Sequence, residues 1–172
     1  MDIKPYIAEV RDWPIPGVSF KDVTPLLGNG EAFHEAIRAL AEKVRILKPD
    51  IIVSPEARGF IFGGAVASLL KIPFVLVRKA GKLPRQAIQE DVVLEYGKTQ
   101  LFMHEDALKK GQKVVILDDV LATGGTSLSI AKMVERLEGT VLSFVFLINL
   151  SYLPGYQRLI KSNYAVDCVL DY

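Results

Sequence analysis

The sequence predicts an α/β fold, in which a mostly parallel central sheet is flanked by helices. Three short apolar runs, at 50–54, 73–78 and 113–117, have the length and composition of buried strands. Segments with helical periodicity alternate with them, at 31–47, 60–71 and 126–138. Strands that alternate with helices favour a parallel sheet covered on both faces. Ligands of such sheets bind at the carboxyl ends of the strands.

Residues 1–47 are predicted to form two helices joined by a long connection. Residues 3–11 have the pattern of a short amphipathic helix, and residues 12–30 form a long connection rich in Pro and Gly. The helix over 31–47 follows, because apolar residues recur there at spacings of three and four, and Pro49 ends it. We expect a single domain over residues 1–172.

The second half of the chain predicts a loop, a hairpin and further strands. Residues 79–91 contain Gly, Pro and charge without periodicity, which indicates a mobile loop that we expect to extend to about residue 95 at the active site. The segments 91–97 and 99–104 predict a β-hairpin that turns at Gly97 and Lys98. Two more strands are expected at 140–149 and 165–170.

Composition excludes several classes of protein. The formal net charge of the 172 residues is only +1, which gives no general reason to expect nucleic acid or a membrane as partner. Cys168 is the single cysteine, so an intrachain disulfide is impossible and a reducing compartment is favoured. The N-terminal residues lack the apolar core of a signal peptide. We therefore expect a cytoplasmic protein.

The segment 113–126 carries the strongest chemical signal. An apolar strand is followed by two acids, a loop of small residues and the start of a helix. Backbone N–H groups and the dipole at a helix start bind phosphate, and glycines allow close approach. Carboxylates repel phosphate but accept hydrogen bonds from vicinal hydroxyls, so the whole segment suits a ribose 5-phosphate. The residues assigned to this ligand are Asp118, Asp119, Ala122, Thr123, Gly124, Gly125 and Thr126.

Other interpretations of this segment are weaker. The two acids and two glycines alone would also suit a capped helix preceded by a turn. No Lys follows the glycines as it does in a Walker P-loop, and the dinucleotide motif G-x-G-x-x-G is not present here.

Cations follow the two preceding strands. Arg58 comes shortly after the strand at 50–54, Arg78 and Lys79 end the strand at 73–78, and Lys82 lies in the predicted loop. Each of these cationic residues alone would be interpreted as a solvated surface charge. Together, at the ends of neighbouring strands, they predict a positive site for pyrophosphate, which the planar guanidinium of Arg58 can bind through two hydrogen bonds.

The segment 114–126 resembles the fingerprint of the type I phosphoribosyltransferases, an apolar strand followed by two acids and a Thr-Gly-Gly-Thr-like loop. The resemblance implies phosphoribosyl pyrophosphate as donor and Mg2+ that is held mainly by the substrate, with no ligand directly from the protein. Five motifs, in matching order and spacing, resemble the members of this family that use adenine: PGVSFKD at 16–22, EARGF at 56–60, RKAGKLP at 78–84, LEYGK at 94–98 and DDVLATGGT at 118–126.

The resemblance also implies a small N-terminal hood at approximately residues 1–30, and it assigns the adenine site to this hood. Residues Val18, Ser19, Phe20 and Lys21 would form a strand in which the Ser19 backbone binds the adenine edge, while Phe20 and Val120 pack on the faces of the base. Adenine carries an amino donor where hypoxanthine and guanine carry an oxo acceptor, so a fixed carbonyl discriminates by roughly 1–3 kcal/mol or more. Lys21 replaces the Arg usual at its position, which weakens the case for a side-chain role there.

The implied reaction is displacement at ribose C1, giving AMP and pyrophosphate. Arg58 and Lys82 would stabilise the leaving pyrophosphate, and the resemblance places Glu95 against the base to handle its proton. Closure of the predicted loop would exclude water. The resemblance also implies a homodimer with residues 78–82 near the active site of the partner.

Two alternatives differ in substrate or class. A phosphoribosyltransferase for hypoxanthine, guanine, xanthine or orotate would share the donor site, but the hood motif and LEYGK argue against it. A non-catalytic regulator that binds phosphoribosyl pyrophosphate would need a DNA-binding element. Only about a dozen residues precede the segment that contains the hood motif, and no basic recognition helix is visible.

Overall fold

The computed structural model describes residues 1–94 and 97–172, which form two compact units. The first unit is Met1–Ala39 and the second is Leu40–Tyr172. The first unit therefore extends past the hood predicted at residues 1–30 and includes the first half of a long helix, α2 (Gly30–Leu47). Helix α2 begins one residue before the helix predicted over 31–47, and it ends at the predicted residue, Leu47.

The first unit contains a small antiparallel hairpin. Its elements before α2 are the 3-10 turn η1 (Lys4–Tyr6), β1 (Ala8–Arg11), β2 (Ser19–Asp22) and α1 (Thr24–Leu27). The helix predicted over residues 3–11 is wrong, because residues 8–11 pair with β2 instead, Ala8 opposite Asp22 and Arg11 opposite Ser19. Most of β1 is exposed, so its apolar residues face no core that would favour a helix.

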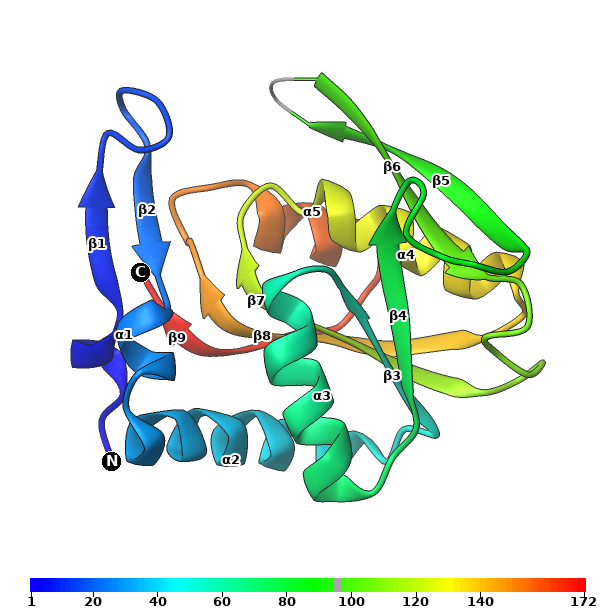
Figure 1. Ribbon diagram of the computed structural model, residues 1–172, viewed down its shortest axis with the longest axis horizontal. Helices are drawn as coiled ribbons and strands as arrows, with labels where there is room; N and C mark the ends of the chain where they lie inside the picture. The colour runs from blue at the N-terminus through cyan, green and yellow to red at the C-terminus, as the bar shows by residue number, and fades with distance from the viewer. Residues whose placement is uncertain (95–96) are drawn as a thin grey trace. The chain divides into compact units, whose positions relative to one another are not determined.

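A seven-stranded sheet organises the second unit (Figure 1). Its strand order is β5-β6-β4-β3-β7-β8-β9, and the five strands from β4 to β9 pair in parallel. The strands are β3 (Ile51–Pro55), β4 (Phe74–Lys79), β5 (Ala87–Leu94), β6 (Gly97–His104), β7 (Lys113–Leu121), β8 (Thr140–Asn149) and β9 (Val166–Asp171). The mostly parallel α/β sheet is therefore confirmed.

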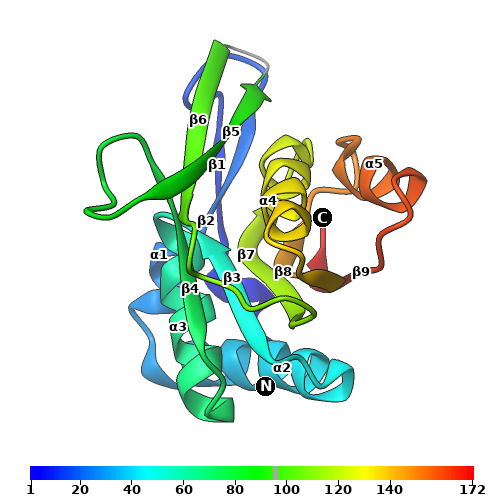
Figure 2. The same ribbon diagram turned by 90° about the vertical axis from the view of Figure 1, so that its right-hand side faces the viewer.

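Helices cover both faces of this sheet. They are α3 (Arg58–Leu70), α4 (Gly125–Arg136) and α5 (Gly155–Lys161), and Figure 2 shows α3 and α4 on opposite sides of the strands. Alternate residues of β3 face opposite sides: Ile51 and Val53 belong to the core cluster that contains Ile130 and Met133 of α4. No helix of the described residues is long and apolar enough to cross a membrane.

The structure corrects the loop and the hairpin predicted after β4. Strand β5 begins at Ala87, so the last part of the predicted loop (79–91) is a strand. Gly97 and Lys98 belong to β6 and pair with Leu94 and Val93, so the turn does not lie at these two residues. The outer edge of β5 is bonded by side chains of α4, a tertiary contact that no local sequence pattern reveals.

Candidate active site

The carboxyl end of β7 leads into a tightly packed turn. Gly124 has a φ of +77°, which favours glycine, and α4 starts at the next residue. The N–H of Gly155, in α5, donates to the Ala122 carbonyl at 3.0 Å. A Cβ at Gly124 would lie 3.2–3.3 Å from the backbone of Gly155. Because neither Gly124 nor Gly155 has a side chain, the start of α5 can pack directly against the turn.

This turn lines a pocket of about 200 Å³. Its lining residues are Asp118, Val120, Leu121, Ala122, Thr123, Gly124, Gly125, Thr126 and Ser127. The structure brings together six of the seven residues assigned to ribose 5-phosphate, and Val120, assigned to adenine, lines the same pocket. Leu121 and Ser127 were not predicted. We call this pocket the cradle.

The two acids lie inside β7, two residues before its end, and not after the strand as the sequence suggested. Asp119, the seventh assigned residue, is 4% exposed and accepts a hydrogen bond from Nε of Arg58. The N–H of Asp119 donates to Oδ1 of Asp118 at 2.8 Å. Desolvation by the surrounding protein, and then the charge of Asp119, raise the pKa of Asp118 well above its ordinary value.

The start of α3 approaches these acids closely. Arg58 is its first residue, and its partly exposed side chain reaches across to Asp119. A Cβ at Gly59 would lie 2.7 Å from Oδ1 of Asp118, so any larger residue there would displace the carboxylate. The predicted pyrophosphate ligand Arg58 therefore also orients one of the predicted ribose ligands.

A second charged group lies where β3 and β4 end. Arg78 donates to Oε2 of Glu56 from Nη2 at 3.0 Å, and the N–H of Lys79 donates to Oε1 at 2.6 Å. Burial acts to raise the pKa of Glu56, but these donors outweigh it and lower the pKa. Nη1 of Arg78 also donates to the carbonyl of Lys82 at 3.1 Å. Glu56 was not predicted, and it fixes Arg78.

The predicted cations lie at the ends of adjacent strands, because β3 pairs with β4 on one side and β7 on the other. Lys79 and Lys82 are exposed. Glu95, predicted to be catalytic, lies outside the described residues. Among residues 1–94 and 97–172 no cluster of three or more His, Cys, Asp or Glu side chains is arranged to hold a metal ion.

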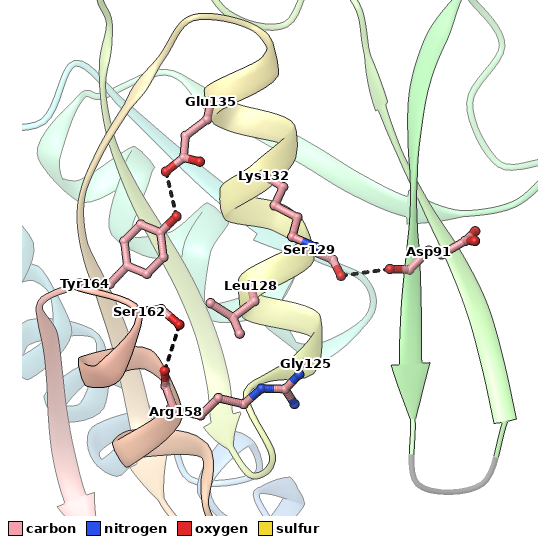
Figure 3. Close-up of a pocket in the computed structure, with 9 residues that line it drawn as sticks. All are labelled: Asp91, Gly125, Leu128, Ser129, Lys132, Glu135, Arg158, Ser162 and Tyr164. Carbon is pink, nitrogen blue, oxygen red and sulfur yellow. Dashed lines mark hydrogen bonds between the residues drawn. The ribbon is translucent and has the colours of Figure 1, made fainter.

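The far side of α4 carries a second pocket, of about 360 Å³ (Figure 3). It is lined by Asp91, Gly125, Leu128, Ser129, Lys132, Glu135, Arg158, Ser162 and Tyr164. Nη1 of Arg158 lies 3.4 Å from the Thr123 carbonyl, so α5 contacts the cradle turn a second time. Helix α5 was not predicted, because its only signal in the sequence is a short apolar pattern after Pro154.

In the first unit, the predicted base-binding strand is β2 together with the preceding Val18. Lys21 is buried and lies 3.3 Å from Oε1 of Glu9 on β1, which also accepts from Oγ of Ser19 at 2.7 Å. The hydrogen bond from Ser19, followed by Lys21, lowers the pKa of Glu9. Phe20 packs edge-on against Trp13, with ring centroids 4.5 Å apart. The side chains of Ser19 and Lys21 thus stabilise the hairpin.

Residues 26–169 match the sequence profile of the phosphoribosyl transferase domain. The chain belongs to the phosphoribosyltransferase family. An adenine phosphoribosyltransferase of Thermotoga sp. (strain RQ2) is 52% identical over 159 residues, which cover 92% of this chain and 94% of that protein. Within the phosphoribosyltransferases, the chain therefore groups with those that use adenine.

Solved phosphoribosyltransferases have the same fold. The adenine phosphoribosyltransferase of Thermoanaerobacter pseudethanolicus superposes with a TM-score of 0.95 at 45% identity, covering 99% of this chain and 98% of that one. The Saccharomyces cerevisiae enzyme, in complex with D-2,5-dideoxy-2,5-imino-altritol 1,6-bisphosphate and adenine, gives 0.90 at 35%, covering 98% and 96%. The expected family is confirmed, whereas the roles of individual residues stay predictions.

Proposed function

We propose that this chain transfers the 5-phosphoribosyl group from phosphoribosyl pyrophosphate to adenine, giving AMP and pyrophosphate. It is thus a pentosyltransferase of purine salvage, in keeping with the 52% identical adenine phosphoribosyltransferase. The observation that carries the proposal is the cradle, in which a helix start and two glycines stand next to Asp118 on one strand–turn–helix segment. A ligand with a phosphate and a diol a few bonds apart can bind to the helix start through the phosphate and to Asp118 through the diol.

The donor's 5-phosphate would bind to the turn of the cradle. The backbone N–H groups at the start of α4 and the hydroxyls of Thr123 and Thr126 are suited to its oxygens. The ribose hydroxyls would donate to Asp118 and Asp119. A carboxylate whose pKa is raised by burial gains from hydroxyl donors that replace lost water, which supports Asp118 in this role.

The pyrophosphate would bind where β3 and β4 end. Arg58, Arg78, Lys79 and Lys82 would share its negative charge as the bond to ribose C1 breaks. Mg2+ would be held mainly by oxygens of the donor, with no ligand directly from the protein, and it would neutralise part of the charge of the leaving group. The residues present fit that arrangement, because arginines already engage Asp119 and Glu56, which would leave the phosphate oxygens of the donor as the ligands of the ion.

The base would attack C1 from the side opposite the leaving pyrophosphate. A ring nitrogen of adenine forms the new bond, the bond from C1 to the pyrophosphate oxygen breaks, and the proton lost by the base passes to Glu95. The N–H and C=O groups of Ser19 on β2 would select adenine by its amino group. The ion pair of Lys21 with Glu9 supports a role for the backbone of β2, and not for the Lys21 side chain, in binding the base. The ion pair joins β2 to β1 and engages the Lys21 side chain with Glu9.

We also propose a homodimer in the cytoplasm. Large apolar side chains are exposed on α3 and on the strand beside it, with Ile61 40%, Leu69 51% and Leu76 39% exposed. An apolar face of this kind favours association with a second copy. The single cysteine, Cys168, agrees with a reducing compartment. Light scattering after gel filtration would test the dimer.

A panel of bases tests the proposed reaction. The purified chain is incubated with phosphoribosyl pyrophosphate, Mg2+ and one of adenine, hypoxanthine, guanine, xanthine or orotate, and nucleotide and pyrophosphate are quantified. AMP from adenine alone is the expected outcome. Turnover of another base would keep the donor site but overturn the role of residues 18–21. Donor binding without turnover of any base would favour a non-catalytic regulator.

A further inference from the structure

The hairpin of β5 and β6 is attached to the sheet only near its base. Strand β6 pairs with β4 through two residue pairs, Arg78 with Phe102 and Lys79 with Leu101, whereas β5 and β6 pair along their whole length. Strand β5 is the edge of the sheet, so its outer carbonyl groups have no neighbouring strand among the described residues. An edge of this kind needs other partners for its backbone if it is buried.

Helix α4 supplies these partners. Oγ of Ser129 donates to the carbonyl of Asp91 at 3.1 Å, and Nη1 of Arg136 donates to the carbonyl of Gln89 at 2.7 Å. The two carbonyls are two residues apart and so point to the same side of the strand. The Glu90 carboxylate between them lies 3.3 Å from Nη1 of Arg136. We call the two hydrogen bonds to the backbone the edge clip.

The edge clip joins the hairpin to the helix that begins at the cradle. Ser129 is 5% exposed and stands four residues, about one turn, after Gly125. Val92, next to the clipped Asp91, is fully buried in the same core cluster as Ile130 of α4. Figure 3 shows Ser129 reaching from α4 to the backbone of Asp91. Helix α4 therefore contacts both the turn of the cradle and the middle of β5.

We propose that Ser129 and Arg136 are positioning residues, which set the placement of the hairpin relative to the cradle through the edge clip. The inference rests on the proposed function, in which Glu95 follows directly after the end of β5 in the chain. The edge clip bonds β5 to α4, and the first residues of α4 line the cradle. Its loss is therefore expected to lower the rate of the chemical step and to leave donor binding nearly unchanged.

Steady-state kinetics of Ser129→Ala and Arg136→Met test this proposal. Ser129→Ala removes one hydrogen bond of the edge clip, and Arg136→Met removes the other together with the contact to Glu90. Each variant is expected to lower kcat about two- to tenfold, with the KM for phosphoribosyl pyrophosphate changed by less than about twofold. Ser162→Ala is the matched control, because Ser162 lines the same pocket of about 360 Å³ as Ser129 but donates to the carbonyl of Arg158. Arg45→Met controls for the loss of a helix arginine, since Arg45 pairs with Glu42 on α2.

Hydrogen exchange separates positioning from a general loss of stability. In Ser129→Ala the amides of residues 87–94 should exchange about two- to tenfold faster, while those of β8 keep the wild-type rate. Unchanged exchange in β5, or an unchanged kcat, would overturn the proposal, and so would a rise in donor KM equal to the loss in kcat. If the wild type failed to turn over adenine, the proposed function would fall, and the exchange rates would still decide whether the edge clip holds the hairpin.

Discussion

The cradle and the hairpin differ in what holds them in place. The cradle follows β7, which pairs with a strand on each side, and its turn is bonded backbone to backbone with Gly155. The hairpin has two residue pairs with β4 and three side-chain hydrogen bonds from α4, and Val92 of β5 is buried against the core. A site fixed by backbone is preorganised and insensitive to most substitutions, whereas one held by side chains at its base can move. Donor binding and the chemical step should therefore respond to different substitutions.

The largest effect should come from Glu95→Gln. If Glu95 accepts the proton of the base, the amide cannot replace it, and we expect kcat to fall by roughly 10²–10⁴-fold with little change in donor affinity. Pre-steady-state turnover with adenine measures the chemical step. Glu105→Gln, an exposed acid just after β6, is the control and should keep the wild-type kcat. A wild-type kcat in Glu95→Gln would show that Glu95 takes no part in the chemical step.

Gly155→Ala should disturb the cradle from behind. The new Cβ would overlap the Ala122 carbonyl oxygen and lie 2.9 Å from Cδ1 of Leu121, so the turn must shift. We expect the dissociation constant of the donor to rise by about tenfold to a hundredfold, and the free energy of unfolding to fall by about 1–3 kcal/mol. Gly64→Ala in α3 has open space for its Cβ and should gain about 0.5–1 kcal/mol. Wild-type donor affinity in Gly155→Ala would show that the turn is not rigid.

Asp119→Asn tests the ribose contact at the same site. Removing the charge weakens hydrogen bonds from the ribose hydroxyls and also releases Arg58, so we expect donor affinity to fall about tenfold. Isothermal titration calorimetry with phosphoribosyl pyrophosphate and Mg2+ measures this. Asp106→Asn, which breaks an exposed ion pair with Arg85, should leave donor affinity unchanged. Equal affinities for the two variants would contradict the assignment of Asp119.

The sequence predicted the residues of the cradle better than the distant residues that hold them in place, for a physical reason. Residues 118–126 are contiguous, so most of the residues that line the cradle already stand together in the sequence. Glu56 holds Arg78 across 22 residues and Gly155 meets Ala122 across the sheet end, and such contacts exist only once the strands have paired. The same reason explains the error at residues 8–11, where pairing with β2 replaced the predicted helix. Local patterns specify a strand–turn–helix segment but not what packs behind it.

Asp118→Asn should have the smallest effect, and it compares stability with function within the cradle. Because the pKa of Asp118 is raised in the folded protein, the folded state holds a proton that the unfolded chain releases at about pH 4. The ligand-free wild type should therefore lose stability as pH rises from about 4 through the raised pKa. Asn carries no charge, so the variant should unfold a few degrees higher at pH 7, by about 2–4 °C for each 1 kcal/mol regained.

Thermal unfolding of both proteins from pH 4 to pH 8 measures this difference. The gap in melting temperature should widen with pH and nearly vanish near pH 4, and parallel curves would contradict a raised pKa. Phosphoribosyl pyrophosphate should stabilise the wild type more than Asp118→Asn, because the charged carboxylate then meets hydroxyl donors. A carboxylate that weakens the empty protein and strengthens the donor complex is what a binding residue on a rigid backbone requires, since that backbone cannot move away to relieve the charge.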